Sequence, residues 1–250
     1  MAAPAEPVAY PAHLVEDWRL RDGRAVRIRP IHADDLAMHS AFVAGLSDRT
    51  GYHRLLSPRK PQPDELWRMT HIDYARELAL IATTEVDGAR QQMGVVRYVR
   101  GDTPETAGIA EFAVVIADAW QRHGLAEKLM RALIAAARDA GVRQLADITL
   151  YDNLAMIALA RKLGFKVQRD AGNPNVSRLR LALAPPGCLP PAARAASAAA
   201  RARCRRVQRP PARHAPCVAL PCPSEAPQVP RKAHRKDSVT KLNKLKTTSL

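Results

Sequence analysis

The stretch from Ile109 to Gly141 constrains the fold more than any other part of the sequence. An apolar run, IAEFAVVI, is followed by a short polar segment and then by residues 125–140, in which apolar side chains recur at helical spacing. Gly141 ends this repeat. A buried strand that runs through a glycine-containing turn into an amphipathic helix is typical of a sheet covered by helices.

Periodicity and turn residues predict the remaining elements. Strands are expected at 25–31, 78–86, 91–100, 109–116, 144–151, 165–170 and 177–183, and helices at 34–46, from 63, 125–140 and 154–163. Asp87-Gly88 predicts a tight hairpin between the second and third strands. The fold class expected from this order is α/β, with a mixed sheet and helices on both faces.

The composition changes sharply at residue 184. Residues 184–250 hold 14 basic and two acidic residues, all four cysteines, 11 of the 20 prolines and no aromatic residue. Such a segment cannot bury enough apolar surface to offset the entropy lost on ordering. We therefore expect an N-terminal extension over 1–17, one domain over 18–183 and a disordered basic tail over 184–250.

The charge balance argues against a nucleic-acid-binding domain. Residues 1–183 carry 25 basic and 22 acidic side chains, so the basic excess belongs to the tail. The tail alone could hold nucleic acid through phosphate contacts. No apolar run spans a bilayer, and the N-terminus does not match a secretory signal, so a cytoplasmic protein without membrane contact is expected. The cysteines of the tail form a poor zinc pattern, and no metal is expected.

Residues Gln121–Ala126 lie where the central strand meets its helix. The first amides of a helix have no intrahelical acceptor, and together with the helix dipole they suit a pyrophosphate. Gly124 lets the backbone approach a ligand closely. A glycine is also common in any turn of this kind, so the glycine by itself does not separate function from structure. The spacing matches neither a dinucleotide fingerprint nor a P-loop.

The pattern Q-x-x-G-x-A after a strand ending in VVI, followed by Asn153 and then RKLGF at 161–165, resembles the GNAT superfamily of acetyl-CoA-dependent N-acyltransferases. The resemblance covers residues 18–183. The segments TGYHRLLSPRK, HIDYAREL and AEFAVVI are most similar to the acetyltransferase domain of bacterial Pat-type protein-lysine acetyltransferases. The resemblance implies the GNAT fold, with a central, mixed and mostly antiparallel sheet.

The resemblance also implies which residues bind acetyl-CoA. The turn made of Gln121, Arg122, His123, Gly124, Leu125 and Ala126 would wrap the pyrophosphate through backbone amides, with the His123 side chain solvated. The strand end made of Val114, Val115 and Ile116 would diverge from its neighbour and pair its main chain with pantetheine. Asn153 would touch the pantetheine arm. The family places acceptor-binding loops at the connection that contains Tyr52, His53 and Arg54.

Acetyl transfer to an amine requires a base. A lysine ammonium has a reference pKa of about 10.4, so its deprotonation at pH 7 costs about 4–5 kcal/mol. Glu111 is the best candidate, since it is a carboxylate within an otherwise apolar strand, and Pat-like enzymes have a glutamate base at the matching position. The alternative is an outward-facing glutamate with a surface contact. Many family members carry a tyrosine acid where this chain has Ala160.

The function expected from these residues is direct transfer of an acetyl group to a primary amine. The relatives imply a protein lysine as acceptor, such as one in an acyl-CoA synthetase. Two alternatives remain open at this point. A small-molecule amine could be the acceptor, or the domain could be a non-catalytic acyl-CoA sensor, as Ala160 suggests.

Overall fold

A computed structural model describes residues 9–184 of the chain. Within them, eight strands form one sheet in the order β1-β2-β3-β4-β5-β6-β8-β7. Every neighbouring pair is antiparallel except β5 and β6, which run parallel. The strands are β1 (Glu16–Arg19), β2 (Ala25–Pro30), β3 (Glu77–Val86), β4 (Ala89–Arg100), β5 (Ile109–Ile116), β6 (Gln144–Leu150), β7 (Lys166–Arg169) and β8 (Val176–Ala182).

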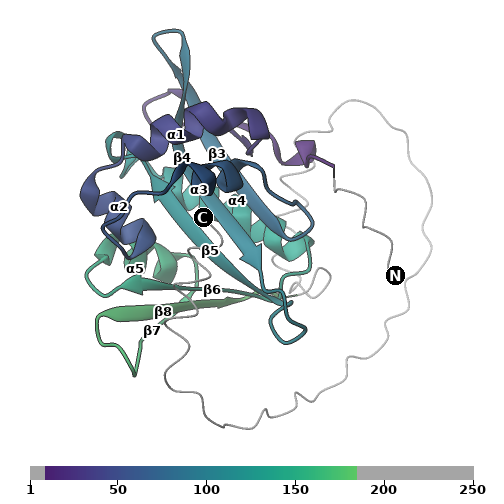
Figure 1. Cartoon of the computed structure of the whole chain (residues 1–250), viewed down its shortest axis with the longest axis vertical. Helices are drawn as coiled ribbons and strands as arrows, with labels where there is room; N and C mark the ends of the chain where they lie inside the picture. The colour runs from purple at the N-terminus through teal and green to yellow at the C-terminus, as the bar shows by residue number, and fades with distance from the viewer. Residues whose placement is uncertain (1–8, 185–250) are drawn as a thin grey trace, which may run out of the picture. The chain divides into compact units, whose positions relative to one another are not determined.

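Helices cover both faces of this sheet (Figure 1). One face carries α1 (Leu36–Ala44), α2 (Asp48–Leu55) and α3 (Pro63–Thr70), and the other carries α4 (Leu125–Asp139) and α5 (Leu154–Lys162). Short 3-10 turns occupy Ala12–Leu14, Ala33–Asp35 and Asp118–Trp120. The fold class expected from the sequence, a mixed and mostly antiparallel sheet with helices on both faces, is thus confirmed.

The alternation of side chains along the strands builds a separate core on each face. Phe112 and Leu145 pack with Leu129 and Leu133 of α4 in the larger core. A smaller core, under α1, is formed by Ile31, Phe42, Ala79, Ile81, Val95 and Val115. Even-numbered residues of β5 therefore face α4, and its odd-numbered residues face α1–α3.

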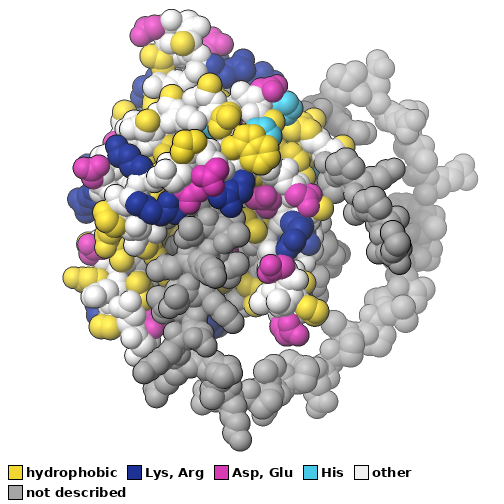
Figure 2. All heavy atoms as spheres, in the orientation of Figure 1, with side chains coloured by type: hydrophobic (Ala, Val, Ile, Leu, Met, Phe, Trp, Pro, Cys, Tyr) yellow, Lys and Arg dark blue, Asp and Glu magenta, His cyan; other side chains and the backbone are white. Residues whose placement is uncertain are grey.

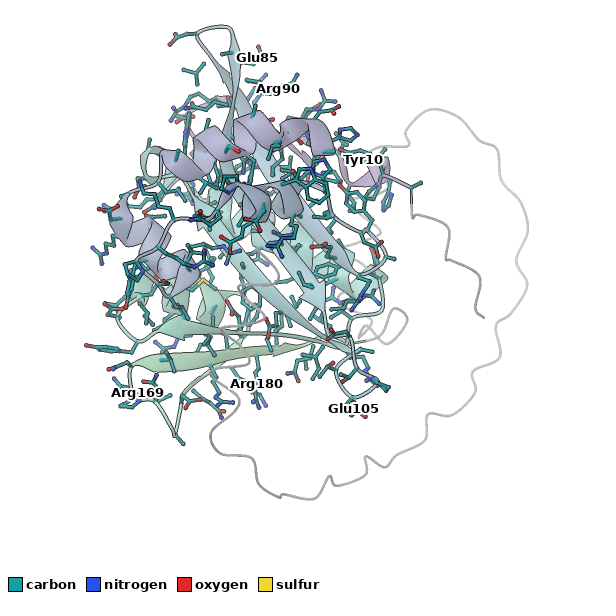
Figure 3. The ribbon with its side chains drawn as sticks, viewed as in Figure 1. Tyr10, Glu85, Arg90, Glu105, Arg169 and Arg180 are labelled. Carbon is teal, nitrogen blue, oxygen red and sulfur yellow. The ribbon has the colours of Figure 1, made fainter. Side chains whose placement is uncertain are left out.

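The β3–β4 hairpin has the turn that Asp87-Gly88 predicts. Both residues have positive φ, 52° and 75°, as a two-residue turn compatible with strand twist requires. Glu85 and Arg90 lie opposite each other near the tip, where the hairpin projects from the sheet (Figure 3).

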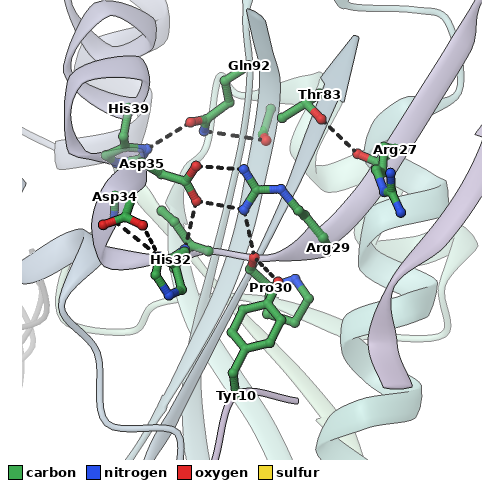
Figure 4. A network of polar contacts seen from close by, with 12 residues as sticks. Tyr10, Arg27, Arg29, Pro30, His32, Asp34, Asp35, His39, Thr83 and Gln92 are labelled. Atoms are coloured by element: carbon green, nitrogen blue, oxygen red, sulfur yellow. Dashed lines mark hydrogen bonds and ion pairs between the residues drawn. The ribbon is translucent and has the colours of Figure 1, made fainter. Parts of the chain in front are cut away.

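A polar network fixes the start of α1 against β2 (Figure 4). Arg29 donates two hydrogen bonds to the buried carboxylate of Asp35, at 2.6 and 2.7 Å, and the His32 amide donates a third at 2.7 Å. Burial opposes ionisation, but these hydrogen bonds outweigh it and hold the pKa of Asp35 below its usual value. His39 of α1 hydrogen-bonds Gln92 of β4 at 3.1 Å. Together these contacts hold α1 over the sheet.

One helix was not expected. Tyr52, His53 and Arg54, which were expected in a connection, lie in α2. Ser47 begins this helix by accepting a hydrogen bond from the Thr50 amide at 3.3 Å. The helix is short, polar and interrupted by a glycine, so it lacks the apolar repeat by which a helix is recognised.

The ends of the sheet can be compared with the domain boundaries expected at residues 18 and 183. The sheet begins at Glu16, where β1 pairs with β2, and it ends with β8 at Ala182. The basic tail, expected over 184–250, lies outside the described residues apart from Ala184. On the face shown in Figure 2, basic and acidic side chains of the described part are intermixed. No helix within residues 9–184 is long and apolar enough to cross a bilayer.

Candidate functional site

The parallel strands β5 and β6 form a fork. They pair only where Ile109–Glu111 lie beside Gln144–Ala146. Beyond this point β5 stays paired with β4 as far as Ile116, but it has no partner on its other edge within residues 9–184. An open strand edge offers main-chain donors and acceptors to an extended ligand.

Glu111 lies at the apex of this fork. It is directly opposite Ala146 in the last paired position of the two strands, and opposite Val99 on its other side. Its side chain is half-buried and follows the odd-numbered face of β5, toward α1–α3. The strand was expected to be buried, but Ile109, Glu111, Ala113 and Val114 are only half-buried. Ala113 and Val114 lie beyond the paired stretch, where the fork opens.

The strand end that was expected to bind pantetheine has its side chains in the two cores. Val115 is 6% exposed and packs under α1, whereas Ile116 is 7% exposed and packs toward α4. Val114 is half-buried against the larger core. A ligand in the fork would therefore meet the main chain of this segment rather than its side chains.

The turn before α4 follows the open end of β5 and contains backbone amides without a helical acceptor. Arg122 and Gly124 have positive φ, 64° and 80°, and no side chain caps the helix. Within α4 the first amide bonded to a preceding carbonyl is that of Lys128, which reaches Gly124 O at 3.1 Å, so the amides at the start of the helix have no helical acceptor. A Cβ atom on Gly124 would meet nothing within 4 Å. There is therefore open space beside the Cα atom of Gly124.

The side chains of this turn have structural neighbours. Leu125 is 1% exposed and packs in the larger core, so only its amide could meet a ligand, and Ala126 is half-buried beside it. The His123 ring is half-buried, with Nδ1 3.9 Å from Oδ2 of Asp22. Gln121 donates from Nε2 to the Ile116 carbonyl at 3.1 Å, which ties the turn to the end of β5.

Asp118 joins this turn to α2. Its carboxylate accepts hydrogen bonds from the Ser47 amide at 3.0 Å, from Ser47 Oγ at 2.7 Å and from Thr50 Oγ1 at 2.7 Å. Burial opposes ionisation, but these hydrogen bonds outweigh it and lower the pKa of Asp118. Gln121 adds a bond to Thr50 Oγ1 at 3.3 Å. These contacts were not predicted from the sequence, because the residues that form them are far apart in the chain and none of them belongs to a recognisable motif.

Asn153 lies on the other arm of the fork, after β6. Its Oδ1 accepts from the Met156 amide at 3.2 Å and so caps α5, while its Nδ2 donates to Thr149 Oγ1 at 3.2 Å. One Nδ2 hydrogen is left for a ligand. Ala160 is fully buried in the larger core, so that position supplies no acid.

A cavity of about 70 Å³ opens on the odd-numbered face of β5, between the sheet and α1–α3. Its floor includes Val95, Arg97 and Val115, and its wall includes Tyr52 and Arg54 of α2. His53, which was expected with these two, instead has its ring 3.9 Å from Oδ1 of Asp152. No group of three or more His, Cys, Asp or Glu side chains within the described residues is arranged to hold a metal ion.

Comparison with known proteins places this arrangement among acetyltransferases. The family model described as the acetyltransferase (GNAT) domain matches residues 25–166. Acetyltransferase PA5475 of Pseudomonas aeruginosa is 37% identical over 172 residues, which cover 68% of this chain and 90% of that protein.

Solved structures agree with this match. The crystal structure of the GNAT domain of S. lividans PAT superposes with a TM-score of 0.63 at 32% identity, over 70% of this chain and 100% of that one. The structure of yncA from Salmonella typhimurium, which contains acetyl-CoA, shares the fold with a TM-score of 0.52 at 20% identity, over 65% of this chain and 99% of that one.

Proposed function

The chain belongs to the acetyltransferase (GNAT) family, and on that premise we propose that it transfers the acetyl group of acetyl-CoA directly to a primary amine, with Glu111 as general base. The observation that carries this proposal is the fork. The parallel pairing of β5 and β6 ends at Glu111, and the open edge beyond it leads to the free amides at the start of α4.

The fork and the turn provide matching places for the two ends of acetyl-CoA. The amides of residues 122–126 would bind the pyrophosphate, supported by the dipole of α4 and the open space at Gly124. The main chain of Val114–Ile116 would pair with pantetheine as an added strand would. Asn153 would contribute its remaining amide hydrogen from the opposite arm.

The chemistry then takes place at the apex of the fork. The acceptor nitrogen loses a proton to Glu111 and attacks the thioester carbonyl carbon. The C–N bond forms, the C–S bond breaks, and coenzyme A leaves as a thiolate that takes up the surplus proton of the attacking nitrogen, which leaves a neutral amide. Since a free thiol has a pKa of about 8.5, this leaving group needs no acid at the position of Ala160.

The acceptor that we propose is a lysine side chain of a protein, for example an acyl-CoA synthetase. The resemblance of the sequence to Pat-type protein-lysine acetyltransferases supports this choice, and the GNAT domain of S. lividans PAT is among the similar solved structures. A small-molecule amine is the second candidate. It is favoured by the cavity under α1–α3, which lies on the same face of the sheet as Glu111.

Substitution of the base tests the proposal. Glu111→Gln keeps the size of the side chain but cannot accept the proton, so kcat should fall about 10²- to 10⁴-fold while the Kd for acetyl-CoA stays within about twofold. The assay is release of free coenzyme A thiol with a lysine peptide or an alkylamine as acceptor. Glu85→Gln, at the exposed tip of the hairpin, is the control and should leave kcat unchanged. Full activity of Glu111→Gln would rule out this base.

A further inference from the structure

The cavity under α1–α3 contains a guanidinium that has no acceptor within residues 9–184. Arg54, in the last turn of α2, lines the cavity and makes no hydrogen bond or ion pair with any residue of the described chain. Two other arginines of the lining are paired. Arg59 donates to Glu65 at 2.6 and 2.8 Å, and Arg97 donates from Nη2 to Glu77 at 2.8 Å. Lys60 and Asp48 also line the cavity, but both are exposed, so Arg54 is the half-buried charge of the lining that lacks a hydrogen-bonded carboxylate within residues 9–184.

Arg97 adds a second unfilled donor. Its side chain forms part of the cavity floor and is almost fully buried, with 6% of the residue exposed. Its Nε is buried and has no hydrogen-bond acceptor within residues 9–184. A buried donor without an acceptor costs free energy. Three other buried atoms of the described residues also lack an acceptor or donor, but of these four residues only Arg97 lines the cavity.

The electrostatics of the cavity favour an anion. Burial and the nearby charge of Arg97 lower the pKa of Arg54 to about 10, although Asp147 offsets part of this effect. Arg54 thus stays charged at neutral pH in surroundings that disfavour its charge. His39 adds no positive charge, because burial lowers its pKa to about 4. An anion in the cavity would stabilise Arg54 directly.

The shape and lining of the cavity select the kind of anion. The volume is about 70 Å³, and much of the lining is apolar, including Phe42, Val43 and Leu46 of α1 and Val95 of β4. Since Lys60 is exposed to water, Arg54 is the half-buried cation that needs a counter-charge, and one negative charge balances it. A carboxylate on a short apolar chain meets both conditions and matches the two-pronged geometry of arginine.

We propose that this cavity binds a carboxylate carried by the amine acceptor, with Arg54 and the free Nε of Arg97 as donors. The inference rests on the proposed acetyl transfer. Val115 in the cavity floor and Glu111 share the odd-numbered face of β5, so the carboxylate and the reacting amine would occupy the same side of the sheet. The carboxylate could come from a free amino acid or from an acidic residue beside a target lysine.

The test compares acids with their amides in the full-length protein. The acceptors are straight-chain ω-amino acids of three to six carbons and the corresponding ω-amino amides. Lysine peptides with either glutamate or glutamine next to the lysine form a second arm. For each pair the ratio of kcat/KM is measured by thiol release. In parallel, pentanoate and pentanamide are titrated calorimetrically without acetyl-CoA.

Three variants locate the effect. Arg54→Gln removes the charge, Arg54→Lys keeps a charge without the planar fork, and Arg49→Gln removes an exposed arginine of the same helix as a control. Because Arg54 has no hydrogen-bonded partner within residues 9–184, Arg54→Gln should unfold at the same temperature as the wild type or a higher one. A lost carboxylate preference in that variant would then not reflect misfolding.

We expect the wild type to favour the acid over the amide by at least about tenfold in one of the two arms, as a charged hydrogen bond allows. That arm identifies the source of the carboxylate. Arg54→Gln should reduce the ratio to below about twofold, Arg54→Lys should retain part of it and Arg49→Gln all of it. An acid-to-amide ratio near one in the wild type, or an unchanged ratio in Arg54→Gln, would overturn the inference. Absence of turnover with every amine would instead contradict the proposed function, while the pentanoate titration still decides whether the cavity binds a carboxylate.

Discussion

Asp118, in the turn that follows β5, accepts hydrogen bonds from both the amide and the hydroxyl of Ser47, the residue that caps α2. These hydrogen bonds connect α2, which lines the acceptor cavity, to the turn proposed to hold the pyrophosphate. The helix and the turn therefore form one connected unit. Binding of acetyl-CoA at the turn and of the acceptor under α2 would depend on the same carboxylate.

Replacing this carboxylate should weaken the whole unit. In Asp118→Ala we expect a loss of about 1 kcal/mol in the free energy of unfolding, since the group is exposed and water weakens its hydrogen bonds. KM should rise for both substrates. Denaturant unfolding and steady-state kinetics measure the two effects, with Asp139→Ala at the exposed end of α4 as the control. A KM change for one substrate only would argue against the connection.

The pH dependence of this effect has a definite sign. The pKa of Asp118 is lowered in the folded state, so its contribution to stability is present above the usual carboxyl pKa and is lost as the pH falls through the folded value. The stabilities of the wild type and Asp118→Ala should therefore converge in acid.

His39 should make the protein less stable in mild acid. Its folded pKa of about 4 lies below the unfolded value of about 6.5, so the unfolded state takes up the proton first and stability falls as the pH drops from 6.5 toward 4. Between pH 7 and pH 5 this group should cost about 2 kcal/mol of unfolding free energy. His39→Gln should remove that part of the slope, and His13→Gln, an exposed control, should retain it. Equal slopes in the wild type and His39→Gln would disprove the assignment.

Gly124 and Gly88 offer a matched pair for testing the turn before α4. Both have positive φ, 80° and 75°, and an added Cβ meets nothing within 4 Å at either position. Alanine at either site should cost about 1–2 kcal/mol of stability through backbone strain. Only Gly124→Ala should raise the KM for acetyl-CoA, by tenfold or more, roughly the loss of one charged hydrogen bond. If both variants had the same KM for acetyl-CoA, the proposal that this turn binds the pyrophosphate would be wrong.

The elements of the fold were predictable where the information is local. The strand at 109–116, the long helix after it and the Asp-Gly hairpin follow from periodicity and turn chemistry, and the structure confirms them. The family resemblance is confirmed as well, by the matching GNAT model and by S. lividans PAT. Local patterns and the resemblance together therefore gave the architecture and the position of the turn.

The parts that escaped prediction depend on contacts between distant residues. No sequence pattern marks α2, because its stability comes from Ser47 and its contact with Asp118 rather than from an apolar stripe. The cavity brings Arg54 and Arg97 together from a helix and a strand 43 positions apart in the chain. Which charged groups lack partners is a property of the packed structure and cannot be read from composition.

Removal of the basic tail tests whether the described domain is sufficient. Every strand and helix that builds the fork, the turn and the cavity lies between Glu16 and Ala182. A protein truncated after residue 185 should keep kcat and the KM for acetyl-CoA within about twofold, because the residues proposed to bind the pyrophosphate and the amine all precede the tail. Loss of acetyl transfer on truncation would assign the tail a role in the site.

A crystal structure with bound acetyl-CoA tests the central claim most directly. The account predicts that pantetheine lies along Val114–Ile116 in the fork, that the pyrophosphate meets the amides of residues 122–126 and that the thioester lies beside Glu111. Acetyl-CoA bound outside the fork, or a Glu111 carboxylate directed away from the thioester, would contradict it.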